Sequence, residues 1–269
     1  MQNLPDIYFL HIPKTAGSSL TNLIHKSYPV HERLDAFEWY ELVKIESQRL
    51  QEYRCFTGHF GTGLFSLLDR QIPTVTLLRD PFERVVSHLN FAWARSRQNH
   101  RGLWARMLGQ LPVMTYFKYV LARPQRWRAF DNVQTYHLGV DLDLRPWRKK
   151  PDHRELAMLL KQLANNQSQE EILQKAKRTL NSMAVVGTVE RLGESVKLIC
   201  AHLGIPVPDT LPTKNVSPVR QLHVRYQDTW TFPTWMRDRI ESLIELDRDV
   251  YTYGCRLLET RLTHGKHLP

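Results

Sequence analysis

A loop that carries a lysine and three hydroxyl side chains follows the first apolar run of the chain, YFLHIPKTAGSSL. The apolar run Ile7–Ile12 predicts a strand, and a helical pattern begins after the loop. The free N–H groups of a helix's first turn and the helix dipole favour an anion in front of them. The segment therefore predicts a strand, a tight loop and a helix N-terminus that suit a phosphate-like group. Its candidate ligands are Lys14, Thr15, Ala16, Gly17, Ser18 and Ser19.

The residue order in this loop differs from that of a Walker A motif. That motif places its lysine at the end of a glycine-bearing loop, whereas Lys14 comes first here and no glycine precedes it. A P-loop kinase or nucleotide hydrolase would also need an aspartate that binds magnesium. On these residues alone, an ordinary turn between a strand and a helix is the alternative.

The segment TVTLLRDPFERVVSHLNFAW predicts a second strand, turn and helix. Thr74–Leu78 alternates too little for a half-exposed strand and is typical of one buried in a parallel sheet. Asp80 suits the N-cap, Pro81 the first helical position and Glu83 the third, as in a capping box. Arg79 lies at the carboxyl end of the strand, where open α/β sheets bind ligands. A surface arginine that pairs with a neighbouring carboxylate is the alternative. The helix is expected to bury Val85, Val86 and Leu89.

Together these two segments resemble the sulfotransferases that use 3′-phosphoadenosine 5′-phosphosulfate (PAPS), closest to the heparan 2-O- and 6-O-sulfotransferase branch and its bacterial relatives. HIPKTAGSSL is similar to the family's 5′-phosphosulfate loop, and LLRDPFERVVSHL is similar to its 3′-phosphate motif. In that motif an arginine and a serine eight residues later hold the 3′-phosphate, which is the spacing of Arg79 and Ser87. The resemblance runs from about residue 7 to about residue 254 and is strongest in these two motifs.

The resemblance implies a P-loop-like three-layer α/β fold with a central parallel sheet. It also implies PAPS as the cofactor and 3′,5′-adenosine bisphosphate as its product. No metal is required in principle, because a lysine and a helix N-terminus neutralise the charge. The segment TKNVSPVR resembles a second clamp on the cofactor. The residues of this clamp would be Lys214, Asn215, Ser217 and Arg220.

The third candidate is His59, in the segment RCFTGHFGTGLF. Tyr53–Thr57 is predicted as a short buried strand, so the glycine-flanked histidine would follow it at the ligand edge. Histidine suits a general base because its ordinary pKa lies near neutral pH. The uronyl 2-O branch has a similar Gly-His segment whose histidine is the catalytic base. His11 is expected to be structural, and it and Glu38 are the next candidates for the base.

The expected reaction is transfer of a sulfuryl group to an acceptor hydroxyl, with a carbohydrate as the first expectation from the resemblance. His59 would remove the hydroxyl proton, and Lys14 would neutralise the leaving oxygen. The backbone N–H groups of residues 16–19 would hold the 5′-phosphate. A tyrosine, a lipid or a small metabolite stays open as the acceptor, and the oligomeric state is unknown.

The length and composition agree with a single domain over residues 1–269. The formal net charge is +10. Positive potential favours an anionic donor and acidic acceptors, and it also fits a basic nucleic-acid-binding protein. No zinc-finger, homeodomain or RNP signature occurs, so no nucleic-acid partner is expected.

Three widely spaced cysteines favour reduced thiols and a cytoplasmic location. No apolar run reaches transmembrane length, and the early first strand leaves no room for a signal peptide. The anchor and stem of the family's Golgi members are missing, which indicates a bacterial-type enzyme or a trimmed chain.

The remaining sequence predicts how these segments are held. Residues 95–183 have a helical pattern broken by prolines, which we interpret as a large insertion that forms the acceptor wall. Met183–Val189 is predicted as a later strand, followed by a helix that ends at Leu203 with Gly204 as its stop. Pro233–Tyr253 is predicted as one terminal helix.

Overall fold

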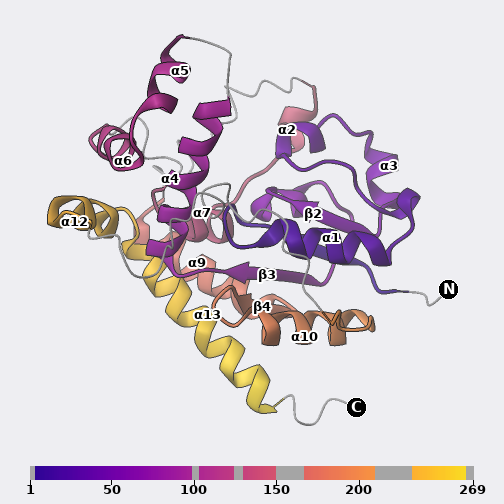
Figure 1. Cartoon of the computed structure of the whole chain (residues 1–269). Helices are drawn as coiled ribbons and strands as arrows, with labels where there is room; N and C mark the ends of the chain where they lie inside the picture. The colour runs from indigo at the N-terminus through magenta and orange to yellow at the C-terminus, as the bar shows by residue number, and fades with distance from the viewer. Residues whose placement is uncertain (1–3, 99–102, 124–129, 150–166, 210–231, 265–269) are drawn as a thin grey trace.

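The computed structural model of the chain describes residues 4–98, 103–123, 130–149, 167–209 and 232–264. Its centre is a four-stranded, all-parallel sheet in the order β2-β1-β3-β4 (Figure 1). Every strand residue is buried, as expected for a parallel sheet that helices cover on both faces. The strands are β1 (Ile7–Leu10), β2 (Cys55–Gly58), β3 (Thr74–Leu78) and β4 (Val185–Thr188).

The register aligns the carboxyl ends of the strands at one edge of the sheet. Leu10, the last residue of β1, pairs with Gly58 of β2 on one side and with Thr76 of β3 on the other. The loops that follow β1, β2 and β3 are therefore neighbours. This confirms that the segments of Lys14, His59 and Arg79 leave the sheet at the same edge.

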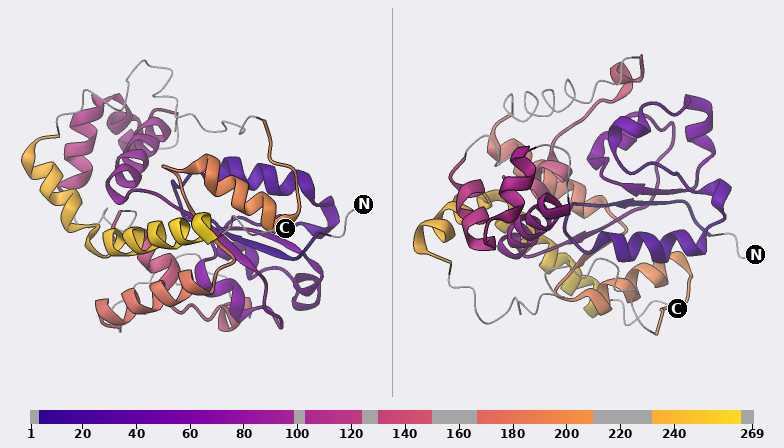
Figure 2. Two further views of the ribbon diagram at one scale, coloured as in Figure 1. Left: turned by 90° about the horizontal axis from the view of Figure 1, so that it is seen from below. Right: turned by 45° about the horizontal axis from the view of Figure 1, so that its top comes forward.

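Two helices cover one face of the sheet: α1 (Gly17–Ser27) and α10 (Leu192–Leu203) (Figure 2). Apolar side chains of both helices, among them Ile24 and Ile199, share one core cluster with Phe9 and Val75 of the sheet. Gly204 ends α10 in the left-handed conformation (φ 67°), as the sequence predicts.

Helices also cover the opposite face, so the described part of the chain has three layers. The core there joins Tyr8 and Phe56 of the sheet to Leu138 and Leu180 of the covering helices. Those helices are α7 (Val133–Gly139), α9 (Gln169–Ser182) and α13 (Glu245–His264), joined by the 3-10 helix η2 (Gly61–Ser66). Shorter elements beside β2 and η2 are η1 (Val30–Glu32), α2 (Trp39–Leu42), α3 (Ser47–Glu52) and η4 (Arg145–Lys149).

A further hydrophobic core lies beyond the carboxyl ends of the strands, among the helices drawn there in Figures 1 and 2. It packs Leu89 and Trp93 against Phe117 and Met236. Val85, Val86 and Leu89 are buried in it, as predicted. Its helices are α4 (Pro81–Gln98), α5 (Leu103–Gln110), α6 (Val113–Leu121) and α12 (Thr234–Ser242).

Most predicted elements are present, with small shifts in their ends. β3 has the predicted bounds, β2 begins two residues later than predicted, and β4 occupies the middle of the predicted Met183–Val189. The described part of residues 95–183 contains helices and no strand. None of the helices in the described ranges combines the length and the apolar composition that a bilayer crossing needs.

The prediction of one terminal helix over Pro233–Tyr253 is wrong, because the chain bends between α12 and α13. Asn132, which precedes α7, stabilises this bend from outside. Its side-chain oxygen accepts hydrogen bonds from the N–H groups of Leu246 (2.9 Å) and Asp247 (3.1 Å). Its own N–H donates to the carbonyl of Leu243 (2.8 Å). A distant side chain thus supplies the N-terminal cap of α13.

Candidate functional site

The loop between β1 and α1 has an unusual backbone for its residue types. Lys14 (φ 73°) and Ala16 (φ 59°) both adopt the left-handed conformation, which costs a residue with a Cβ roughly 1–3 kcal/mol. Alternation of left- and right-handed residues gathers backbone N–H groups into a concave nest that binds anions. The N-cap residue of α1, Ala16, makes no side-chain capping bond. The geometry is that of an anion-binding loop at a helix N-terminus.

Two of the predicted loop ligands also have structural tasks. The hydroxyl of Thr15 is fully buried and donates to the carbonyl of Ile12 (2.9 Å), so its proton serves the loop itself. Gly17 faces the ring of His11, and a Cβ on Gly17 would lie about 2 Å from ring atoms. His11 is 4% exposed, which agrees with the structural role expected for it.

The Lys14 ammonium lies over the ring of Phe91, 4.0 Å from its centroid. Burial, and then the neighbouring charge of Arg79, lowers the pKa of Lys14 to about 8. The lysine is therefore a partly desolvated cation whose charge a bound anion would stabilise.

The turn between β3 and α4 is held by side chains. The carboxylate of Asp80 accepts from the N–H of Glu83 (3.0 Å), so the predicted N-cap is correct. The reciprocal half of the predicted capping box is absent. Glu190, which follows β4, accepts the Asp80 N–H instead (2.9 Å).

Arg79 joins the two phosphate-type turns. Its Nη1 donates to the carbonyl of Lys14 (3.3 Å), and its Nη2 lies 3.6 Å from the carboxylate of Glu83. Glu83, Ser87 and Phe91 are spaced four residues apart on α4 and therefore share one face of the helix. Ser87 thus lies on the face that has the Arg79 guanidinium at one end and the Lys14 ammonium at the other.

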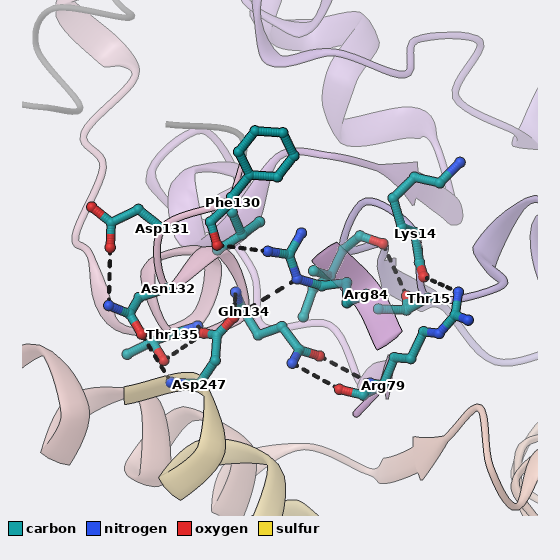
Figure 3. Close-up of polar contacts among 12 residues, drawn as sticks. Lys14, Thr15, Arg79, Arg84, Phe130, Asp131, Asn132, Gln134, Thr135 and Asp247 are labelled. Atoms are coloured by element: carbon teal, nitrogen blue, oxygen red, sulfur yellow. Dashed lines mark hydrogen bonds and ion pairs between the residues drawn. The ribbon is translucent and has the colours of Figure 1, made fainter. Parts of the chain in front are cut away.

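Hydrogen bonds from α7, which α13 holds in turn, keep Arg79 in place, and the sequence did not predict this frame (Figure 3). Gln134 of α7 binds both backbone groups of Arg79: its side-chain oxygen accepts the N–H and its amide donates to the carbonyl, each at 2.9 Å. Gln134 is fully buried, so it acts as a short strand partner at the end of β3. The residues 130–139 look like part of an insertion in the sequence. The only signal there is an amide inside an otherwise apolar helical face.

The N-terminus of α7 is itself held by a buried carboxylate, that of Asp247. Its oxygens accept from the N–H groups of Gln134 (3.2 Å) and Thr135 (2.7 Å) and from the Thr135 hydroxyl (2.8 Å). Arg84, fully buried on α4, has its Nε 3.8 Å from Asp247 and donates from Nη2 to the carbonyl of Phe130 (2.9 Å). Burial raises the pKa of Asp247 and lowers that of Arg84. The pair links α4, α7 and α13 beneath the site.

His59 lies at the carboxyl end of β2, as predicted. Its backbone N–H donates to the carbonyl of Phe37 (2.8 Å), and its ring packs against Phe37 and His11, each 4.4 Å between centroids. Its Nδ1 is 2.6 Å from the His11 carbonyl. A carbonyl only accepts, so Nδ1 carries the proton and Nε2 keeps a lone pair. Burial lowers the pKa of His59, and Lys14 lowers it further against the opposing effect of the His11 carbonyl.

The structure brings most of the predicted site residues to one edge of the sheet. Glu38, a reserve candidate for the base, instead begins α2, where its N–H donates to Glu41 (3.0 Å). A hollow of about 240 Å³ opens beside Phe37, with the carboxylates of Asp35 and Glu41 in its lining. The predicted second clamp, Lys214, Asn215, Ser217 and Arg220, lies outside the described residues.

The described ranges hold no group of three or more His, Cys, Asp or Glu side chains suited to a metal ion. No family model matches the chain, and no curated protein matches it.

Proposed function

We propose that the chain is a sulfotransferase with a P-loop-like fold, which moves a sulfuryl group from PAPS to an acceptor hydroxyl. The observation that carries this proposal is the face of α4 that bears Ser87. The guanidinium of Arg79 lies at one end of this face and the ammonium of Lys14 at the other. A nucleotide with phosphates on both the 3′ and the 5′ side needs two such cationic positions.

The residues present fit such a donor. The 5′-side group would lie against the left-handed loop of Lys14 and Ala16, whose backbone suits an anion. The 3′-phosphate would be held by Arg79 and Ser87. Lys214, Asn215, Ser217 and Arg220 belong to the proposal as a second clamp on the resemblance of their segment alone.

The chain's own residues would act through position and charge. When bound, the donor supplies a sulfuryl group whose sulfur bonds to the acceptor oxygen as its bond to the 5′-phosphate oxygen breaks. His59 Nε2 has a lone pair to accept the hydroxyl proton. Lys14 neutralises the negative charge that develops on the phosphate side. Neither task requires a metal ion.

The acceptor proposed first is a carbohydrate. Phe37 lines this hollow and its ring packs against that of His59, so we assign the body of the acceptor to the hollow. Asp35 and Glu41 in its lining favour hydroxyl or amino groups there over carboxylates or sulfates. The cysteines Cys55, Cys200 and Cys255 are all free, which agrees with the cytoplasmic location we propose.

Binding measurements without magnesium test this function against its two alternatives. Calorimetry should detect 3′,5′-adenosine bisphosphate, with ATP and a random oligonucleotide binding at least tenfold more weakly. Preference for ATP that strengthens with magnesium would indicate a kinase or nucleotide hydrolase. Preference for the oligonucleotide would indicate a nucleic-acid-binding protein.

A further inference from the structure

A second histidine ring faces His59 from α7. The ring centroids of His59 and His137 are 6.5 Å apart, with the planes at 81°. Like that of His59, the Nδ1 of His137 is bound to a backbone carbonyl, Val133 O, at 2.8 Å. By the same reasoning Nδ1 carries the proton, and His137 also keeps a lone pair on Nε2. Among the described residues, neither Nε2 has a hydrogen-bond partner.

The position of His137 is fixed by contacts along α7. Gly61, with φ +55°, approaches so closely that a Cβ would lie 3.0 Å from the His137 carbonyl. The hydroxyl of Thr62 donates to the carbonyl of Val140 at the end of α7 (2.7 Å). Asp247 holds the other end of the helix. A side chain on an element clamped in this way is placed precisely enough to contact a substrate.

The two imidazoles are neutral together near pH 7. Burial, and then the neighbouring His59, lowers the pKa of His137 to about 4. Burial also lowers the pKa of His59. The reacting hydroxyl has a single proton, which only one imidazole can take. The other lone pair is then available to a second hydroxyl.

We propose that His137 is a second acceptor contact, whose Nε2 accepts a hydrogen bond from a hydroxyl adjacent to the one that His59 deprotonates. This inference rests on the proposed function. It makes His137 a specificity-determining residue. Acceptors with two neighbouring hydroxyls, as on a sugar ring, would be preferred over a phenol or an isolated alcohol.

Nitrogen-15 NMR of the imidazoles tests this contact without turnover. The full chain is loaded with 3′,5′-adenosine bisphosphate, and the rings are assigned with His59→Gln and His137→Gln. Methyl α-D-glucopyranoside should shift the Nε2 resonances of both His59 and His137. Cyclohexanol, which has one hydroxyl, should shift only that of His59. A His137 resonance that does not respond to the glucoside would overturn the proposal.

A pair of substitutions separates hydrogen bonding from packing. The amide of His137→Asn reaches the place of Nδ1, whereas that of His137→Gln reaches the place of Nε2. With the glucoside as acceptor, His137→Asn should lower kcat/KM roughly three- to tenfold, and His137→Gln should retain most of it. With cyclohexanol both variants should match the wild type. His202→Asn, on the exposed end of α10, is the control.

Equal losses with both acceptors, or a larger loss in His137→Gln than in His137→Asn, would show that the ring only supports the fold. The proposed function fails separately. In that case the wild-type chain would not bind 3′,5′-adenosine bisphosphate in the calorimeter. If the nucleotide binds and the His137 ring is silent, the sulfotransferase proposal stands and the second contact does not.

Discussion

The turns after β1 and β3 both present a cation at the carboxyl edge of the sheet, but they are held in different ways. The β1–α1 loop keeps its shape through two left-handed residues and leaves the first turn of α1 without a side-chain cap. In the β3–α4 turn, backbone N–H groups donate hydrogen bonds to the side chains of Asp80, Glu190 and Gln134. The backbone of the loop itself shapes the first turn, whereas side chains from other elements hold the second. Substitutions at the first should therefore change chemistry, and those behind the second should change stability.

The largest expected effect is that of His59→Ala, which removes the proposed base beside the first turn. Acid–base catalysis contributes roughly a hundred- to ten-thousandfold, and kcat should fall by that amount. Affinity for 3′,5′-adenosine bisphosphate should stay nearly unchanged, because the base faces the acceptor. Steady-state kinetics measures kcat and calorimetry measures nucleotide affinity, with His202→Ala as the control. Lost nucleotide affinity with kcat retained at saturation would mean a binding or structural role.

Asp247→Asn tests the frame behind the second turn. The carboxylate is buried, accepts three hydrogen bonds and lies beside Arg84, so its loss leaves a buried cation without its partner. Such a change should lower the free energy of unfolding by about 3–5 kcal/mol, and urea denaturation would measure the difference. Asp249→Asn, exposed on the same helix, should change stability little. Equal stability of the two variants would contradict the role given to the frame.

Lys14→Ala should have the opposite profile, with turnover lost and the fold kept. Loss of one positioned charge at a leaving group costs on the order of a hundredfold or more in kcat. The urea midpoint should stay close to that of the wild type. Lys26→Ala, exposed near the end of α1, is the matched control. Near-normal turnover in a folded Lys14→Ala protein would remove the lysine from the reaction.

The pH profile of kcat/KM should have two limbs, because the reaction requires His59 in one protonation state and Lys14 in another. His59 must be neutral, and its pKa is lowered, so activity should fall only below the usual histidine range near 6.5. Lys14 must be charged, and its pKa is about 8, so activity should fall as the pH rises through that value. Lys14→Arg should move the alkaline limb upward by more than one pH unit. An alkaline limb that does not move would assign it to another group.

Local sequence patterns predicted most of the fold but only part of the candidate site. The positions of the strands, the Asp80 cap and the Gly204 stop depend on nearby residues, so local patterns predicted them. The bend before Glu245 could not be predicted, because Asn132 stabilises it from more than a hundred positions away. The bonds between Gln134 and Arg79, which are 55 positions apart, could not be predicted either. Loop strain at Lys14 and Ala16 was also hidden, since neither residue type signals a left-handed backbone.

The structure also changes how the 3′-phosphate should be tested. Arg79 donates to the Lys14 carbonyl, so Arg79→Ala would loosen both turns and blur the comparison between them. Ser87 lies on the α4 face between the two cations and offers the cleaner substitution. Its hydroxyl would donate one hydrogen bond to a charged group, worth roughly 1.5–3 kcal/mol.

The most direct test of the central claim is calorimetry of 3′,5′-adenosine bisphosphate and 5′-AMP on the wild type and on Ser87→Ala. If the two turns hold the two ends of one nucleotide, the wild type should bind the bisphosphate at least tenfold more tightly than 5′-AMP. Ser87→Ala should weaken binding of the bisphosphate roughly ten- to a hundredfold and leave the affinity for 5′-AMP unchanged. Equal affinities for the two nucleotides, or equal losses for both in Ser87→Ala, would contradict the claim.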